Sequence, residues 1–320
     1  MSKSTAITIA PQRDIDLQAD LLTLLAEWHA SLDLRVRTGE LSPASRRTYV
    51  DGVKRFFDWC SGYSSITDDV IREWLGDLRG SGCKPASINT WLSGLRAFFA
   101  WAVGARRIPY NPAAGIKSAK RNDSRQHKRD ALTNSEIRRV LAMPDDTPAG
   151  LRDRAIIYLM AYTAARTVEV YRADLSDLST KANRPVLKVR GKGRQESDEV
   201  IVIANHEAES ALHDWISARG NKPGPLFTSL SHRSKDGRLS LSSIRRLVKS
   251  YYKLAGVVGE NKTTHSLRHA AISSAIANHA PIQKARAMAR HRSIDTTMIY
   301  VHESDRVEQP AEQFIDYGDA

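Results

Sequence analysis

The sequence predicts a mainly α-helical protein of two domains, with one small β-sheet or hairpin in the second domain. Three observations predict this fold class. Apolar residues recur at helical spacing through the first hundred residues, a basic stretch short of large apolar residues follows, and strand-like runs occur only after it. A chain of 320 residues is long enough for two domains with cores of their own. We therefore expect a flexible tail at 1–16, a helical domain at 17–115, a basic linker at 116–130 and an α+β domain at 131–320.

Start signals and apolar spacing place four helices in the first domain. Apolar residues predict a helix from about residue 17 to Leu34. Ser42 and Pro43 predict the start of a second helix, because a serine hydroxyl accepts from free amides and proline suits the first helical turn. The other two helices are expected at 67–79 and 85–104. Their Trp and Phe residues fall on apolar faces, so we expect them in a core rather than against nucleic-acid bases.

The helices of the second domain are predicted in the same way. Thr133 and Glu136 have the spacing of a capping box, and residues 150–171 are predicted to form one buried helical stretch. Asp295 predicts a helix start near the end of the domain, because its carboxylate can cap the amides of Thr297 or Met298. Further helices are expected at 205–219 and 240–255.

The only convincing strands are the runs PVLKV and EVIVI, at 185–189 and 199–203. They predict a β-hairpin whose connection contains Gly191-Lys192-Gly193-Arg194. This stretch is not a phosphate-binding P-loop, because it lacks the full glycine spacing and the Ser or Thr after the lysine. By itself, Lys192 is either an ordinary exposed turn lysine or a cation that can swing into an active site.

Composition and charge indicate the partner. The apolar and charged fractions, 41% and 26%, are typical of a soluble globular protein. The 48 Lys and Arg exceed the 36 Asp and Glu, which leaves a net charge of +12 and predicts a polyanionic partner. No run of 18 apolar residues offers a membrane span, so we expect nucleic acid rather than a membrane. The two cysteines, Cys60 and Cys83, are expected to be reduced core thiols of a cytoplasmic protein.

Four chemically active side chains follow one another near the end of the chain: His265, Arg268, His291 and Tyr300. His265 and Arg268 are three residues apart, so on a helix they project from one face. A phenol, with an ordinary pKa of about 10, is a poor nucleophile at neutral pH and needs a base and cations at a phosphate. The group therefore predicts a site that displaces an oxygen from phosphorus. Arg166 and Glu169 are also three apart, but such a pair is by itself more often a structural ion pair.

The order Arg166, Lys192, His265-x-x-Arg268, His291, Tyr300 resembles the pattern of the tyrosine recombinase (phage integrase) family, in its simple two-domain type, like that of the Xer and Cre recombinases. The resemblance rests on TAARTVEV, GKGR, THSLRHA and ARHRSIDTTMIYVH. Two departures are visible. The family more often has Gly-x-Arg where this chain has Ala164-Ala165-Arg166, and Leu-Gly-His where it has Ala289-Arg290-His291. We expect the alanine to be tolerated within a helix and the enzyme to be competent.

The resemblance implies a helical core-binding (SAM-like) domain, an α+β catalytic domain and a role for each active residue. Tyr300 would attack the scissile phosphate to give a 3′-phosphotyrosine and a 5′-hydroxyl, while Arg166 and Arg268 hold the non-bridging oxygens. Lys192 would protonate the departing oxygen. His265 would transfer a proton, His291 would donate a hydrogen bond to the phosphate, and Glu169 would orient the Arg166–His265 side of the site.

The implied substrate is a double-stranded DNA recombination site, bound by a dimer at each site and a tetramer in the synapse. The implied reaction needs no cofactor, no metal and no ATP; a need for accessory proteins stays open. Basic residues expected to contact DNA are Arg46, Arg47, Lys54, Arg55, Lys117, Lys120 and Arg121. For the four on the second helix, a solvated face is the simpler alternative.

Two other functions remain open from the sequence. A type IB topoisomerase has similar Arg-Lys-Arg-His-Tyr chemistry but relaxes supercoils without pairing two sites. A DNA-binding or architectural protein would need no tyrosine at position 300. The job of the recombinase itself, integration and excision of a mobile element or resolution of DNA dimers, is not specified by the sequence.

Overall fold

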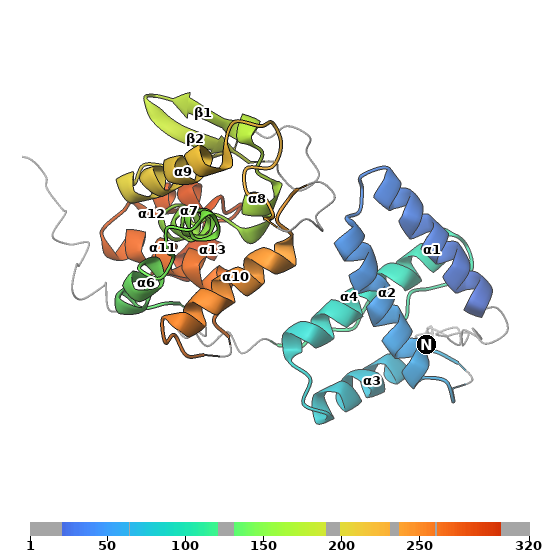
Figure 1. The fold of residues 1–320 in the computed structure, drawn as a ribbon. Coiled ribbons are helices and arrows are strands. Elements are labelled where there is room, and N and C mark those ends of the chain that lie inside the picture. The colour runs from blue at the N-terminus through green and yellow to red at the C-terminus, as the bar shows by residue number, and fades with distance from the viewer. Residues whose placement is uncertain are drawn as a thin grey trace, which may run out of the picture. The chain divides into compact units, whose positions relative to one another are not determined.

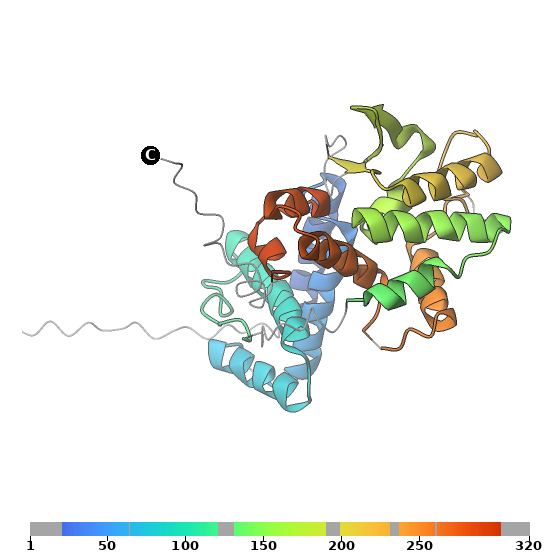
Figure 2. The same ribbon diagram turned by 90° about the vertical axis from the view of Figure 1, so that its left-hand side faces the viewer.

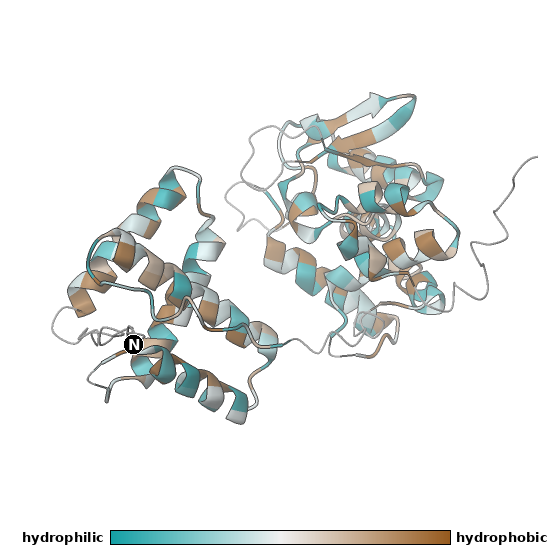
Figure 3. Cartoon of the chain, turned by 180° about the vertical axis from the view of Figure 1, so that it is seen from behind, coloured by the Kyte–Doolittle hydropathy of each residue, from teal (hydrophilic) through white to brown (hydrophobic). Residues whose placement is uncertain are grey.

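The computed structural model describes residues 21–63, 65–120, 131–189, 199–230, 237–259 and 261–301. The chain divides into two compact units, Met1–Asp123 and Ser124–Ala320. The described residues are mostly helical, with a small antiparallel sheet in the second unit, which confirms the predicted fold class (Figure 1). In both units apolar and hydrophilic stretches alternate along the helices (Figure 3). None of the described helices is both long and apolar enough to cross a membrane.

The described helices of the first unit lie close to their predicted positions, and the predicted start of the first helix, at about residue 17, lies outside the described residues. In the described residues of this unit, the helices are α1 (Leu21–Arg37), α2 (Pro43–Trp59), α3 (Asp68–Gly80) and α4 (Pro85–Gly104). The hydroxyl of Ser42 accepts from the amide of Ser45 at 3.0 Å, with Pro43 in the first turn. Thr67 caps α3 in the same way. The first helix continues three residues beyond the predicted end at Leu34, because the chain turns only at Gly39, whose φ of +79° suits glycine.

Helices α2 and α4 pack closely because each carries a glycine at their contact. A Cβ on Gly52 would lie 2.5 Å from the carbonyl oxygen of Trp91, and one on Gly94 would lie 2.6 Å from that of Tyr49. The backbones can therefore approach until the aromatic side chains interlock. Phe56 and Phe98 are fully buried in the resulting core, which confirms the prediction for Phe98.

The second unit is organised around α7 (Pro148–Thr163), which packs against α9 (His206–Arg219) and α11 (Thr264–Ala277). It is seen end-on in Figure 1 and lengthwise in Figure 2. The other helices in the described residues of this unit are α6 (Asn134–Leu141), α8 (Thr167–Arg172), the 3-10 turn η1 (Leu175–Asp177), α10 (Leu241–Leu254), α12 (Ile282–Ala289) and α13 (Asp295–Met298). The capping box predicted for Thr133 and Glu136 is present at the start of α6.

The sheet extends the predicted hairpin. Strand β2 (Arg184–Lys188) pairs antiparallel with β3 (Val200–Val202), as the two apolar runs predict. A further strand, β1 (Leu178–Lys181), was not predicted and pairs with the other edge of β2. It has the sequence LSTK, which lacks an apolar run. Its signal is the tight turn at Ala182 and Asn183, whose φ values of +48° and +59° match the turn type that favours asparagine.

Two local predictions were wrong. Residues 150–171 are not one helix, because the chain leaves helical geometry between α7 and α8. Asp295 does not cap the amides of α13; those of Thr297 and Met298 bond to the carbonyl of Ile294. The carboxylate of Asp295 instead accepts from the hydroxyl of Ser293 at 2.8 Å.

Candidate active site

The interruption between α7 and α8 places Arg166. Ala164 ends α7 in the left-handed conformation, with φ +53°, and Arg166 is extended, with φ −79° and ψ 147°. Glu169, one turn into α8, accepts from the Arg166 amide at 2.6 Å and from its Nη1 at 2.8 Å. Ala164 is therefore not an alanine within a helix, as expected from the sequence, but the residue that turns the chain into the site.

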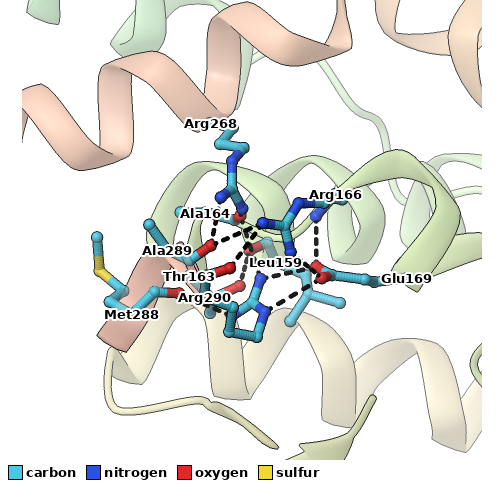
Figure 4. A network of polar contacts seen from close by, with 9 residues as sticks. All are labelled: Leu159, Thr163, Ala164, Arg166, Glu169, Arg268, Met288, Ala289 and Arg290. Carbon is cyan, nitrogen blue, oxygen red and sulfur yellow. Dashed lines mark hydrogen bonds and ion pairs between the residues drawn. The ribbon is translucent and has the colours of Figure 1, made fainter. Parts of the chain in front are cut away.

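Arg268 reaches the same place from α11. It is buried, and its guanidinium donates to the carbonyl oxygens of Ala164 and Ala289. Arg166 Nη2 also donates to Ala289, at 3.2 Å. Figure 4 shows these groups converging from three parts of the chain. Burial, followed by the charges of Arg166 and Arg290, lowers the pKa of Arg268 to about 10, so it remains a cation at neutral pH.

Tyr300, just after α13, is buried beside these cations, with 7% of its surface exposed. It packs in an apolar group with Ala164, Ile272 and Ala289. Its hydroxyl is hydrogen-bonded to Nδ1 of His269. Burial raises the pKa of Tyr300, and the charge of Arg268 offsets only part of that increase, so the free protein holds a protonated phenol.

His269 is a site residue that the sequence interpretation missed. It lies within THSLRHA, four residues after His265 on α11, so helical spacing puts both imidazoles on one side. Their ring centroids are 6.2 Å apart, and the His269 ring lies 5.4 Å from that of Tyr300. The signal was present in the motif, but one chain gives no reason to separate His269 from an ordinary helical histidine.

His265 and His291 are both held neutral. Burial lowers the pKa of His265, and the charges of Arg268, Arg166 and Arg245 lower it further. Burial and the charges of Arg268 and Arg166 lower the pKa of His291 to about 4. Its Nδ1 lies 2.9 Å from the hydroxyl of Thr297, and its ring is stacked 6.4 Å from that of Tyr300. Neutral imidazoles can accept a proton or donate one N–H group, which phosphate chemistry requires.

The structure thus brings five of the expected catalytic residues to one place: Arg166, His265, Arg268, His291 and Tyr300. The sixth, Lys192, lies outside the described residues. Glu169 contacts Arg166 as expected, but its other hydrogen bonds go to Arg290 rather than to His265. Among the described residues, no three His, Cys, Asp or Glu side chains gather as a metal site would require.

The expected DNA-contacting residues fall into two kinds. Arg46 is paired with Asp33 at 2.6 Å, and Arg55 is paired with Asp51 at 3.0 Å and lies over the ring of Trp91. The others that the structure describes are exposed and form no ion pair with its described acidic residues: Arg47, Lys54, Lys117 and Lys120. Arg121 lies outside the described part of the chain.

A tyrosine buried among guanidinium groups and neutral imidazoles, in a helical unit with a small sheet, defines the tyrosine recombinase class of DNA strand-transfer enzymes. The chain belongs to the phage integrase family, whose model matches residues 130–306. The model of the phage integrase N-terminal SAM-like domain matches residues 33–106. These matches confirm the family that the motifs predicted, and with it an enzyme of site-specific DNA recombination.

Individual relatives agree. The chain is 27% identical over 248 residues to the tyrosine recombinase XerC of Haemophilus influenzae, covering 75% of this chain and 78% of that protein. It is 28% identical over 312 residues to a tyrosine recombinase of Synechococcus elongatus, covering 91% and 90%. In fold it is similar to the XerH recombinase in a post-cleavage complex with a palindromic difH substrate, with TM-score 0.70, 19% identity and coverage of 94% and 90%.

Proposed function

We propose that the chain recombines specific sites in double-stranded DNA through a covalent intermediate on Tyr300. The observation that carries this is the position of its hydroxyl, hydrogen-bonded to an imidazole and held beside the buried cation Arg268. A buried structural tyrosine also needs a hydrogen-bond partner for its hydroxyl, but it has no need of a buried cation beside it. A phenol that must attack a phosphate needs a proton acceptor and positive charge at the phosphorus.

In the first step, Tyr300 Oη forms a bond to phosphorus and the bond from phosphorus to the 5′ oxygen breaks. The phenolic proton goes to an imidazole, and His269 is the one in contact with it. The departing 5′ oxygen takes the electron pair and a proton, for which Lys192 is our proposed donor. A 5′-hydroxyl of the partner strand then attacks the phosphotyrosine, and the same transfers run in reverse.

The cations stabilise charge on the non-bridging oxygens. Arg166 and Arg268 approach from different elements, and a guanidinium fork matches two oxygens of a phosphate. His265 and His291 are proposed as neutral hydrogen-bonding and proton-transfer groups around the same phosphate. Because one phosphodiester is exchanged for a phosphotyrosine of similar energy, we propose that the reaction needs neither ATP nor a metal.

Solved relatives support the proposed assembly. Lambda integrase, similar in fold with TM-score 0.67 and 18% identity, is described as a tetramer bound to a Holliday junction. We propose that this chain likewise acts as a dimer on each site and a tetramer in the synapse.

The test uses nicked suicide duplexes tiled from DNA that flanks the gene, incubated with EDTA and separated on a denaturing gel. Wild-type protein should form a covalent adduct, and Tyr300→Phe should form none while still binding the same duplex. Specific binding without an adduct would instead support the DNA-binding alternative. Relaxation of a supercoiled plasmid that carries no paired sites would support the topoisomerase alternative.

A further inference from the structure

Arg290 occupies a backbone position that an arginine adopts only at a cost. It follows α12 with φ +53° and ψ 47°, in the left-handed region that glycine adopts without strain. In most family members this position of the third motif is glycine, so the arginine is a feature of this chain. Its side chain does not face solvent, because only 4% of it is exposed.

Each nitrogen of the Arg290 guanidinium donates to a group inside the protein. Its Nε donates to Glu169 Oε1 at 3.1 Å and its Nη2 donates to Glu169 Oε2 at 2.7 Å, which is a two-point ion pair. Nη1 donates to the carbonyl oxygen of Met288 at 2.7 Å. Because its side chain is only 4% exposed, Arg290 is not a phosphate contact in this arrangement. Its guanidinium acts on the site through Glu169 and through the carbonyl oxygen of Ala164, to which Nη2 donates at 3.3 Å.

Glu169 connects this buried arginine to a catalytic one. The same carboxylate that pairs with Arg290 also accepts from the Arg166 amide and from Arg166 Nη1. The side chain of Glu169 is 5% exposed, whereas that of Arg166 is 33% exposed. The backbone carbonyl of Arg290 also accepts from Arg166 Nη2, at 2.9 Å. Arg290 thus holds Arg166 in two ways, through the carboxylate and through its own backbone (Figure 4).

The charges indicate what the second arginine adds in this chain. A single carboxylate between two guanidinium groups neutralises one of them, and Arg290 is the more deeply buried partner. Burial raises the pKa of Glu169, but the hydrogen bonds and charge of Arg290, followed by the hydrogen bonds of Arg166, outweigh burial and hold that pKa below its usual range. Without Arg290, Arg166 would be the only guanidinium paired with the buried carboxylate of Glu169. The carboxylate would then neutralise the positive charge of Arg166 that the phosphate needs.

We propose that Arg290 is a positioning residue for strand cleavage, which anchors Glu169 so that Arg166 keeps both its orientation and its positive charge for the scissile phosphate. The proposal rests on the proposed function. It concerns how fast an assembled complex cleaves rather than whether it binds DNA.

The test compares Arg290→Met, Arg290→Lys and Arg290→Gly with the wild type in single-turnover adduct formation on saturating suicide duplex. Arg290→Met should cleave about tenfold to a hundredfold more slowly, because Arg166 is misplaced and partly neutralised, with DNA affinity nearly unchanged. Arg290→Lys keeps the positive charge but cannot form the two-point ion pair, so its cleavage rate should lie between those of Arg290→Met and the wild type. Arg138→Met, which removes an exposed arginine from the same unit, is the matched control.

Arg290→Gly separates positioning from stability. Glycine relieves the left-handed backbone, so this variant should melt closer to the wild type than Arg290→Met does, yet still cleave slowly. If Arg290→Gly cleaved at the wild-type rate, Arg290 would not position Arg166. In the Glu169→Gln background the carboxylate is gone, so adding Arg290→Met should cause little further loss. If the rate losses of Glu169→Gln and Arg290→Met multiplied in the double variant, the proposed link through Glu169 would be overturned.

A readout without DNA keeps this inference separate from the proposed function. The carboxyl carbon of Glu169, assigned by comparison with Glu169→Gln in 13C NMR, should titrate at a higher pH in Arg290→Met than in the wild type. An unchanged titration would overturn the proposal even if the wild type cleaves DNA. Conversely, wild-type protein that never forms an adduct would overturn the proposed function and leave this electrostatic link standing.

Discussion

The hydroxyl of Tyr300 is held by His269, a residue outside the six-residue pattern found in the sequence. We expect His269→Ala to slow adduct formation by about a hundredfold, because the phenolic proton loses the acceptor in contact with it. The measurement is single-turnover cleavage of the suicide duplex. His213→Ala, at an exposed position on α9, is the control. Cleavage at the wild-type rate would show that the contact belongs to the free protein only, and that His265 receives the proton.

His291 should make the protein sensitive to acid. In the folded protein its pKa is lowered to about 4, so between about pH 6.5 and 4 the unfolded chain binds a proton that the folded chain does not. Its contribution to stability is therefore present above that window and is lost as the pH falls through it. The expected loss is about 1–2 kcal/mol, less than the full pKa difference implies, because the residue is partly exposed and solvent screens its neighbours.

Denaturant unfolding of the wild type and His291→Gln at a series of pH values checks this expectation. As the pH falls from 7 to 4, the free energy of unfolding of the wild type should fall relative to that of the variant. Below that range the difference should level off. A constant difference would mean that the imidazole is not kept neutral by its surroundings.

At this scale, motif order predicted which residues gather, since Arg166, Arg268 and Tyr300 do lie together. Motif order did not predict the conformation or the contacts of Arg290, because a left-handed φ at a helix end leaves no mark in the sequence unless glycine is present. The same limit applies to Ala164, whose conformation is set by its surroundings, including the guanidinium of Arg268 on its carbonyl.

Among the elements, α2 and α4 depend on close backbone contact. A methyl group on Gly52 would meet backbone atoms of Trp91 at 2.5 and 2.8 Å, and backbone atoms cannot rotate away. We expect Gly52→Ala to separate the helices and destabilise the first unit by about 1–3 kcal/mol. Gly76→Ala on α3 meets nothing within 4 Å and should be neutral or slightly stabilising.

Hydrogen exchange of the full chain measures both variants, since it reports each helix separately. Amides of α2 and α4 should exchange faster in Gly52→Ala than in Gly76→Ala. Equal protection in the two variants would mean that the helices absorb the methyl group by a small shift.

Elements with local start signals were predicted closely, because Ser42, Thr67 and Thr133 satisfy free amides without help from the rest of the fold. The division of 150–171 into α7 and α8 was not predicted. Its apolar residues fit one helix, and the interruption is stabilised by Arg268 and Arg290, more than a hundred residues away in the chain. Strand β1 was missed for a related reason, since its pairing with β2 outweighs its weak pattern.

For the molecule as a whole, the net charge of +12 predicts that DNA affinity falls steeply with salt. We expect the basic residues of α2 to contribute unequally to this dependence. Arg46 and Arg55 already have acidic partners, so they carry little free charge to a phosphate. Arg47 and Lys54 are exposed, and their separation of seven residues puts them on one side of the helix, two turns apart. They are the better pair for adjacent phosphates of one strand.

We therefore expect the double variant Arg47→Ala, Lys54→Ala to bind its DNA site more weakly and to lower the slope of log affinity against log salt by about 1–2, the value for one or two lost phosphate contacts. The control is Arg46→Ala, Arg55→Ala, which removes the same formal charge but only paired groups, and should change the slope much less. Fluorescence anisotropy across a salt series gives both slopes. Equal slopes for the two double variants would mean that the ion pairs open on DNA, so that all four cations of α2 face the backbone together.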